Sequence, residues 1–318
     1  MNSYDGNRLV VTVTLNPTMD KTMLVPHLTV GATNRAEVER VDPGGKGVNV
    51  AKALKQLGCP VVTTGFLGGS NGRLIAEWLA GREIAADFIQ VPGETRVNLK
   101  IKDPLSGTET EINEPGFYVD AKYLKQLEEK LEDYAGRCAA VVLSGSLPPG
   151  VPTDIYARLV RIARHGGAKV ILDTNGDALR HGIAAQPDLI KPNRTEVEEL
   201  LGTKIENETQ LVEAARETLA LGISWLVVSL GADGALAASA DQVWRARCPS
   251  LQARSSVGAG DAMVAALVYS LLNNLSQDEA LRLATAAGSA TASLSGSSVA
   301  DLKLIQEFLP RVEIERVS

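Results

Sequence analysis

The chain contains little of what defines several common classes of protein. It has three cysteines, Cys59, Cys138 and Cys248, which are odd in number and far apart, and only three histidines among 318 residues. Neither a disulfide framework nor a zinc cluster is therefore expected. The net charge is −6 and no block of basic residues occurs, so we do not expect nucleic acid as a partner.

The sequence also shows no targeting or membrane-spanning segment. The first residues contain no basic stretch followed by an apolar one, and no apolar run has the length that a membrane helix needs. We therefore expect a cytoplasmic protein with no membrane partner. Apolar residues make up 45% of the chain, enough for a sizeable core, and 318 residues fit a single domain over 1–318.

The phosphate-binding pattern of the P-loop kinases is absent too, because the nearest glycine cluster, at residues 44–47, has the wrong spacing. What the chain does contain is Gly258-Ala259-Gly260-Asp261, directly before a helical pattern. The first N–H groups of a helix have no intrahelical partner, and glycines let an anion approach them. Asp261 could then take a proton from a hydroxyl that attacks the anion, as in a phosphoryl transferase. The same residues would also suit a plain helix entry turn.

The expected elements alternate between strand and helix along the chain. Strands are predicted at 9–15, 60–66, 86–91, 138–143, 169–172, 188–190 and 225–229, with a meander at 235–238 and 242–247. Helices are predicted at 47–57, 71–80, 153–163, 195–201, 208–221, 258–272, 277–294 and 299–308, and the charged run 125–133 is interpreted as the solvated face of another helix. This order predicts an α/β fold with a doubly wound, mostly parallel sheet, helices on both faces, and ligands at the carboxyl ends of the strands.

One stretch breaks this pattern. Residues 95–102 and 108–112 alternate between apolar and polar side chains, which predicts a β-hairpin with two different faces. Such a hairpin suggests a flap over the site, and residues before Pro43 could add a strand to it. We place this lid at approximately 21–42 and 93–114. The alternative is an edge hairpin of the main sheet.

Two further segments would suit a phosphorylated, hydroxyl-rich ligand. The glycines of residues 43–51 expose backbone N–H groups, Lys46 supplies a cation, and Asn49 can both donate and accept hydrogen bonds. Residues 229–235 join two expected strands through glycines. Either segment could bind a ligand or form an ordinary turn.

Several single residues are open to two interpretations. Asp20 could accept hydrogen bonds from sugar hydroxyls or cap a neighbouring element. Arg35 and Arg96 could bind a phosphate or be solvated surface charges. Asn193 and Glu196 have the spacing of a capping box, and could also lie near Mg²⁺ and nucleotide phosphates.

Taken together and in this order, five segments resemble the signatures of the ribokinase-like, PfkB-type carbohydrate kinases over nearly the whole chain. They are residues 43–51, 144–150, 191–196, 229–234 and 256–261. The resemblance implies a doubly wound α/β domain with a β-sheet lid that also tends to form dimers. It implies an anion hole at Gly258, Ala259 and Gly260, with Asp261 as the base. It further implies ATP near Lys191, Asn193, Ser229, Gly231, Gly234, Gly258 and Gly260, and Mg²⁺ near Asn193 and, through water, Glu196.

Within this family the chain resembles the kinases of phosphorylated sugars. Residues 14–20, 34–35 and 95–100 are similar to the same segments of 1-phosphofructokinases and tagatose-6-phosphate kinases. This implies ATP-dependent phosphorylation of fructose 1-phosphate to fructose 1,6-bisphosphate, with tagatose 6-phosphate as an alternative substrate. Thr33, where the family's 6-phosphofructokinases have lysine, disfavours that activity, and the intact Asp261 and Glu196 disfavour a sensor without turnover. The residues implied for the phosphorylated ketohexose are Asp20, Arg35, Gly44, Gly45, Lys46, Asn49, Arg96, Lys100, Asn113 and Ser144.

Overall fold

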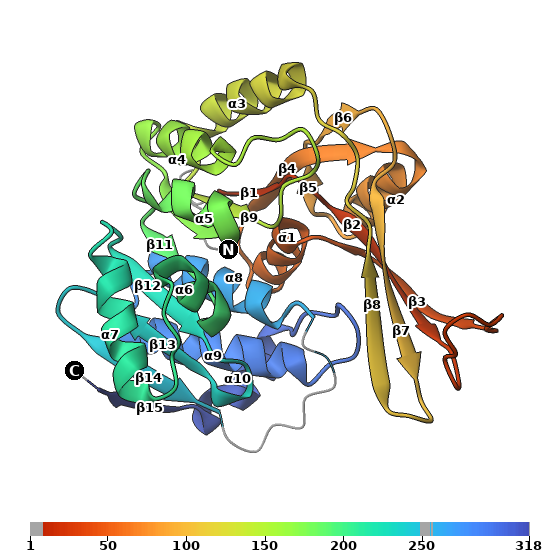
Figure 1. Cartoon of the computed structure of the whole chain (residues 1–318). Coiled ribbons are helices and arrows are strands. Elements are labelled where there is room, and N and C mark those ends of the chain that lie inside the picture. The colour runs from red at the N-terminus through yellow and green to blue at the C-terminus, as the bar shows by residue number, and fades with distance from the viewer. Residues whose placement is uncertain (1–8, 249–254, 256, 318) are drawn as a thin grey trace.

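The protein consists of a large sheet covered by helices on both faces and a small second sheet that projects from one side (Figure 1). The computed structural model describes residues 9–248, 255 and 257–317. The large sheet contains β1 (Val10–Thr14), β4 (Val61–Gly68), β5 (Ala85–Ala86), β6 (Ile89–Val91), β9 (Ala140–Ser144), β10 (Lys169–Asp173), β11 (Leu189–Ile190), β12 (Trp225–Ser229), β13 (Ala235–Ala238), β14 (Val243–Arg247) and β15 (Glu313–Arg316).

The order of these strands confirms the doubly wound architecture. It is β15-β14-β13-β12-β11-β10-β9-β1-β4-β5, and β6 pairs with the end of β4. The strands from β12 to β5 run parallel, and β13 to β15 add an antiparallel edge. Parallel strands with both faces covered should be apolar throughout, and all five residues of β1 are indeed buried.

Each face of the sheet has its own apolar cluster. One face is covered by α1 (Lys46–Gln56), α2 (Gly69–Ala80), α8 (Ala259–Leu272), α9 (Gln277–Ala292) and α10 (Leu302–Phe308). The other is covered by α3 (Ala121–Ala135), α4 (Ile155–His165), α5 (Gly176–Ile183), α6 (Arg194–Leu201) and α7 (Glu208–Leu219). Helix α8 is buried from Asp261 to Val268, as its nearly continuous apolar sequence requires. The start of α8 is thereby fixed against the core.

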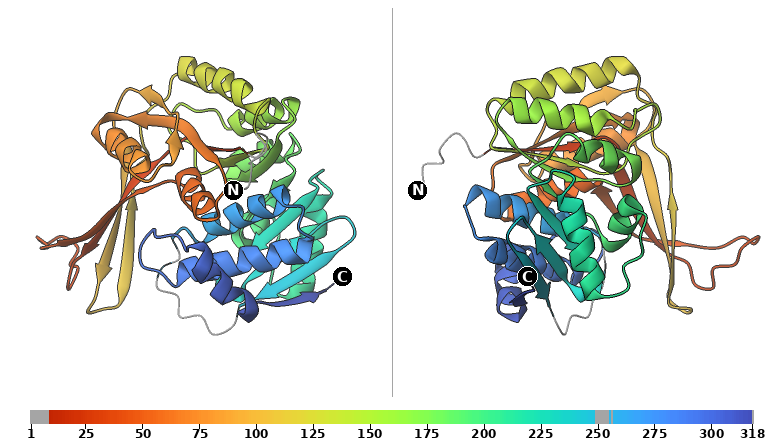
Figure 2. Two further views of the ribbon diagram at one scale, coloured as in Figure 1. Left: turned by 180° about the vertical axis from the view of Figure 1, so that it is seen from behind. Right: turned by 60° about the vertical axis from the view of Figure 1, so that its left-hand side comes forward.

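The small sheet is separate from the large one, so the hairpin is not an edge of the main sheet. Its order is β3-β2-β7-β8, from β2 (Thr18–Leu24), β3 (Glu37–Gly44), β7 (Arg96–Asp103) and β8 (Thr108–Asn113). It extends away from the body in all three views (Figures 1 and 2). Cross-strand pairing puts Asp20 beside Asn98 on one face and Lys21 beside Val41 and Leu99 on the other. The small sheet, which contains the segments predicted as the lid, therefore has one polar face and one mostly apolar face.

Some elements differ from the prediction. The single strand expected at 86–91 is two short strands, β5 and β6, because β5 pairs with the start of β4 and β6 with its end. Strand β2, helix α5 and strand β15 were not predicted. Among the described residues no helix is long and apolar enough to cross a membrane.

Candidate active site

Polar residues meet where the parallel strands end. The register of the sheet aligns the last residues of β1, β9 and β10, so that Thr14, Ser144 and Asp173 form one row. Lys191 follows directly after β11, the neighbour of β10. Ser144 is fully buried, and its hydroxyl has no hydrogen-bond partner within the described part of the chain. This edge is the place where a doubly wound sheet binds its ligand.

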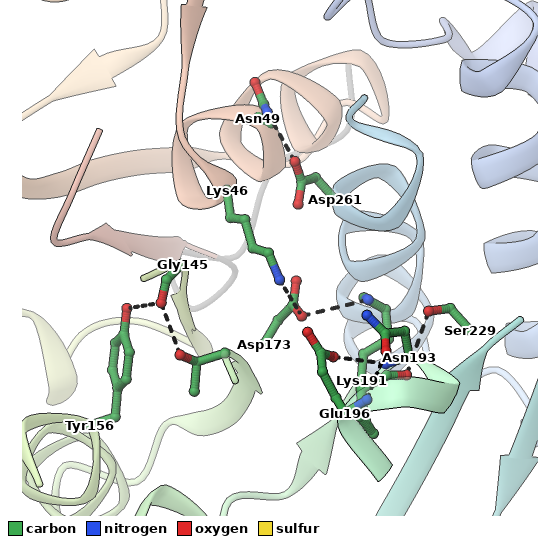
Figure 3. Close-up of polar contacts among 12 residues, drawn as sticks. Lys46, Asn49, Gly145, Tyr156, Asp173, Lys191, Asn193, Glu196, Ser229 and Asp261 are labelled. Atoms are coloured by element: carbon green, nitrogen blue, oxygen red, sulfur yellow. Dashed lines mark hydrogen bonds and ion pairs between the residues drawn. The ribbon is translucent and has the colours of Figure 1, made fainter. Parts of the chain in front are cut away.

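Asp261 lies in the first turn of α8 and faces this edge. Its Oδ2 accepts a hydrogen bond of 2.9 Å from Nδ2 of Asn49 on α1, and the residue is only 7% exposed (Figure 3). Burial raises the pKa of Asp261 to about 6, with a further contribution from the charge of Asp173, against the opposing effects of Lys46, Asn49 and Lys191. A carboxylate with a pKa near neutrality is suited to accept a proton and to give it up again.

The turn before α8 requires glycine. Gly258 has a φ of +78°, in the left-handed region, and is the residue that precedes the helix. A Cβ on Gly260 would lie 3.4 Å from Nζ of Lys191, so the lysine ammonium sits against the first turn of the helix. The first N–H groups of α8 and this cation therefore point to the same region, which suits an anion.

Asp173 holds two lysines together at the end of β10. Its Oδ1 lies 3.1 Å from Nζ of Lys46 and 3.5 Å from Nζ of Lys191 (Figure 3). Burial would raise the pKa of Asp173, but the two ammonium groups outweigh burial and lower it. Burial would lower the pKa of Lys46, and the carboxylates of Asp173, Asp261 and Glu196 raise it instead. Lys46 is therefore held in its positively charged form.

The segment after β11 begins α6 with the predicted capping box. Oδ1 of Asn193 accepts the N–H of Glu196 and the carboxylate of Glu196 accepts the N–H of Asn193, both at 2.8 Å. Asn193 also forms a bridge with Ser229, the last residue of β12. The turn after it, with Gly231 and Gly234 at φ of +61° and +87°, leads into β13. The two nucleotide segments predicted from sequence are thus neighbours.

These residues do not suit a metal ion whose ligands come mainly from the protein. Within the described residues no group of three or more His, Cys, Asp or Glu side chains could hold an ion. Glu196 uses one oxygen in the capping box and has a second, and it is close enough to Lys46 to raise the pKa of that lysine. One carboxylate beside a phosphate site fits Mg²⁺, which keeps most of its waters and binds through few protein ligands.

On the lid side, Asp20 faces the body from β2. A Cβ on Gly44 would lie 2.2 Å from Oδ2 of Asp20, so glycine is required for this close approach. Burial raises the pKa of Asp20, although Lys52 and Arg96 favour its charged form. A pocket of about 160 Å³ separates the lid from the loops around α8. Its lining includes Asp20, Asn98, Lys100, Asn113, Val257 and Gly296.

The predicted cations of the sugar site occupy different positions. Lys100 lies in this pocket, where its Nζ is 3.3 Å from Glu109 and 3.1 Å from Glu111. Arg96, the first residue of β7, is not among the residues that line the pocket, and it donates to the carbonyl oxygens of Glu114 and Asn16, each at 3.2 Å. Arg35 is exposed on the connection between β2 and β3, at the far end of the lid, and is not among the residues that line the pocket.

Three residues of this region were not predicted. Asp173 directly follows the strand predicted at 169–172, and an acidic residue at the end of such a strand is a signal for the site. Lys52 follows Asn49 by three residues, which puts both on one side of α1. Asn98 has a buried Oδ1 without a partner in the described structure. The alternation of apolar and polar residues in β7 predicted that Asn98 lies on the polar face. It did not indicate that the Oδ1 of Asn98 is buried.

Comparisons with known proteins agree with this geometry. Residues 13–303 match the family described as pfkB family carbohydrate kinase. The chain is 41% identical over 278 residues to a 1-phosphofructokinase of Rhodobacter capsulatus, covering 87% of this chain and 88% of the relative. It is 36% identical over 309 residues to the 1-phosphofructokinase of Escherichia coli K12, covering 97% and 99%.

A solved structure extends the comparison to three dimensions. Phosphofructokinase-2 from Escherichia coli in complex with fructose-6-phosphate matches with a TM-score of 0.88 at 30% identity, over 95% of this chain and 98% of the other. Fold and sequence thus agree along nearly the full length. The chain belongs to the pfkB family of carbohydrate kinases, enzymes that transfer a phosphoryl group to an alcohol.

Proposed function

We propose that the protein phosphorylates the C6 hydroxyl of D-fructose 1-phosphate with ATP, giving D-fructose 1,6-bisphosphate and ADP. The observation that supports this most directly is Asp261, a buried carboxylate with a pKa of about 6 at the start of α8, beside Lys191 and within 2.9 Å of Asn49. The 1-phosphofructokinases that this chain resembles at 41% and 36% identity support the choice of sugar.

The sugar phosphate would bind between the lid and the body. Asp20, Gly45 and Asn49 would hold its hydroxyls, because they offer carboxylate, backbone and amide groups close to the pocket. Lys46 and Lys100, with Arg96 behind them, would hold the phosphate that the sugar already has. Lys100 would then exchange its present partners, Glu109 and Glu111, for that phosphate.

The transfer is a single displacement at the γ-phosphorus of ATP. A bond forms from O6 of the sugar to the phosphorus, the bond to the β–γ bridging oxygen breaks, and Asp261 takes the hydroxyl proton. The backbone N–H groups at Gly258, Ala259 and Gly260, together with Lys191, stabilise the charge on the transferred group. The nucleotide lies along Asn193, Ser229, Gly231 and Gly234. Asn193 and, through water, Glu196 would hold Mg²⁺, which would supply positive charge to the phosphates.

Two other phosphorylated sugars keep the same mechanism. Tagatose 6-phosphate is a ketohexose phosphate of the same size and charge. Fructose 6-phosphate is the ligand of the solved phosphofructokinase-2, which is 30% identical to this chain. The higher identity to 1-phosphofructokinases, and Thr33 at a position where lysine is expected for fructose 6-phosphate, favour fructose 1-phosphate.

The substrate assignment is tested by ADP release with Mg-ATP against fructose 1-phosphate, tagatose 6-phosphate and fructose 6-phosphate. We expect kcat/KM for fructose 1-phosphate to exceed the others by about 10²-fold, which corresponds to ~2.7 kcal/mol of transition-state discrimination. A preference for another of these sugars would change the assigned substrate but leave the proposed mechanism in place. Binding of the sugar phosphate and ATP without turnover on any of them would contradict the proposal and favour a sensor.

We also infer that the lid forms a homodimer through its apolar face. The register puts Val41, Leu99 and Ile112 in one row with Lys21, and Val38, Met23 and Ile101 in the next row with Thr110. In the single chain Val38, Val41 and Ile112 are 54%, 48% and 53% exposed. The polar face is turned to the sugar pocket, so the apolar face is left to solvent unless a second lid covers it. A second copy offers the same two-sided sheet, and two such faces are complementary.

Charged residues on this face should separate the two copies. For the double variant Val41→Glu and Ile112→Glu we expect a change from dimer to monomer by light scattering, because the interface would have to desolvate two carboxylates from each copy. Leu302→Glu on α10 is the control, since Leu302 is also exposed, at 42%, but far from the lid. A wild-type protein that is monomeric at tens of micromolar, or an unchanged mass for the double variant, would contradict this interface.

A further inference from the structure

Lys52 is a buried cation that the mechanism above does not use. It lies on α1, is only 4% exposed, and is absent from the lining of the sugar pocket. Its Nζ donates to the backbone oxygen of Pro43 and, at 3.1 Å, to Oδ1 of Asn49. The ammonium also lies 4.9 Å from the centre of the Trp78 ring. A lysine held on three sides in the core calls for an explanation, because burying an ammonium is costly.

The hydrogen bond from Lys52 fixes which way round the Asn49 amide lies. An ammonium group has only donors, so it must meet the oxygen of the amide and not its nitrogen. With Oδ1 turned to Lys52, Nδ2 is turned the other way and donates to Oδ2 of Asp261 at 2.9 Å. If the amide were reversed, its oxygen would face the Asp261 carboxylate, and two acceptors would meet. Lys52 therefore selects the amide orientation that Asp261 needs.

We propose that Lys52 is a positioning residue for phosphoryl transfer, which fixes the Asn49 amide so that Nδ2 holds the Asp261 carboxylate in place. The proposal rests on the proposed role of Asp261 as base. Lys52 touches neither the sugar pocket nor the start of α8, and it acts through Asn49. A chain of two hydrogen bonds thus connects Lys52 to the carboxylate of Asp261.

The charges around Lys52 support this role. Asp20 on β2, Arg40 and Asp42 on β3, and Asp261 on α8 all act on it, and Arg82 stacks on the same Trp78 ring at 3.7 Å. Burial lowers the pKa of Lys52 to about 8, against the three carboxylates, which raise it. The ammonium form of Lys52 therefore predominates below pH 8. In this range Lys52 has only donors, and it orients the Asn49 amide as described above.

The test is a double-mutant cycle in the full-length protein. For Lys52→Met we expect kcat to fall by about 10- to 100-fold, the usual effect of misplacing a reacting group. The acid limb of the pH–rate profile should move to higher pH, because the Asn49 hydrogen bond lowers the pKa of Asp261. In an Asn49→Ala background, Lys52→Met should lower kcat no further, because its route through the Asn49 amide is gone, and the limb should move only by the smaller effect of the lost Lys52 charge on Asp261. A loss of kcat in that background as large as in the wild type would overturn the proposal.

Two further variants keep the outcome clear. Lys55→Met, one turn along α1, removes a partly exposed lysine paired with Glu83 at 3.7 Å, and should leave both readouts unchanged. Lys52→Arg keeps a donor for Oδ1 and should hold the acid limb at its wild-type position, and it supplies the comparison if the methionine variant does not fold. A limb that moves in Lys52→Arg would contradict the proposal. If Asp261→Asn keeps normal turnover, it is the role of Asp261, and not that of Lys52, that has failed.

Discussion

Asp261→Asn is expected to lower kcat by about 10²–10⁴, the usual contribution of a general base, while leaving the Kd for the sugar phosphate nearly unchanged. The amide has the size of the carboxylate and can still meet Asn49, so the shape of the site is retained. It cannot accept the proton of the attacking hydroxyl. Single-turnover kinetics and calorimetric titration of the sugar phosphate measure the two quantities separately. Near-normal turnover would mean that Asp261 is not the base.

Although Asp261→Asn should lower kcat, we expect the same substitution to raise the free energy of unfolding. The pKa of Asp261 is raised to about 6 in the folded protein, so its charged form is disfavoured by folding. This penalty is absent below the ordinary carboxyl pKa, grows as the pH rises through 6, and is full above it. Asp261→Asn should therefore be more stable at pH 7–8, by on the order of 1–3 kcal/mol of unfolding free energy.

The pH–rate profile connects these two results. Wild-type kcat/KM should fall as the pH drops below about 6, because Asp261 becomes protonated and cannot act as base. The residual activity of Asp261→Asn should lack this limb. Asp278→Asn is a matched control, since Asp278 is also an acidic residue in the first turn of a helix, α9. It should change neither kcat nor the limb.

The sequence allowed the alternating core to be predicted because its signals are local. Apolar runs such as β1 and the helical spacing of α1 and α8 depend on residues close together in the chain. Strand β2 was missed because Lys21 interrupts its apolar row, and β15 because four residues at the edge of a sheet carry little pattern. Both elements are defined by their partners, which lie elsewhere in the sequence.

The same distinction applies to the site. Gly258 and Asp261 could be proposed from sequence because turn, helix start and acid are contiguous. The contact between Asn49 and Asp261 spans 212 residues and the contact between Lys46 and Asp173 spans 127, so no spacing reveals them. Arg35 shows the converse, since it belongs to a segment that resembles the family but lies exposed on the lid. Its role in sugar binding stays a prediction.

Asp173→Ala is expected to cost about 3–5 kcal/mol of unfolding free energy, because it breaks a buried ion pair and leaves Lys191, only 5% exposed, without its carboxylate. The pKa of Asp173 is lowered in the folded protein, so its stabilising effect is present above the ordinary carboxyl pKa of ~4 and is lost only as the pH falls below it. The difference between wild type and variant should accordingly shrink at low pH. Urea denaturation across this range measures it.

Two comparisons distinguish the expected effect of Asp173→Ala from the effect of removing any carboxylate. Glu129→Ala removes a carboxylate that is 60% exposed and 3.6 Å from Lys125, and should cost less than ~1 kcal/mol. Inorganic phosphate should restore part of the stability of Asp173→Ala and none of Glu129→Ala, because an anion can take the place of the lost carboxylate between Lys46 and Lys191. The acid limb of Asp173→Ala should move to lower pH, since the charge of Asp173 raises the pKa of Asp261. An unmoved limb together with a small loss of stability would mean that Asp173 does not organise these two lysines.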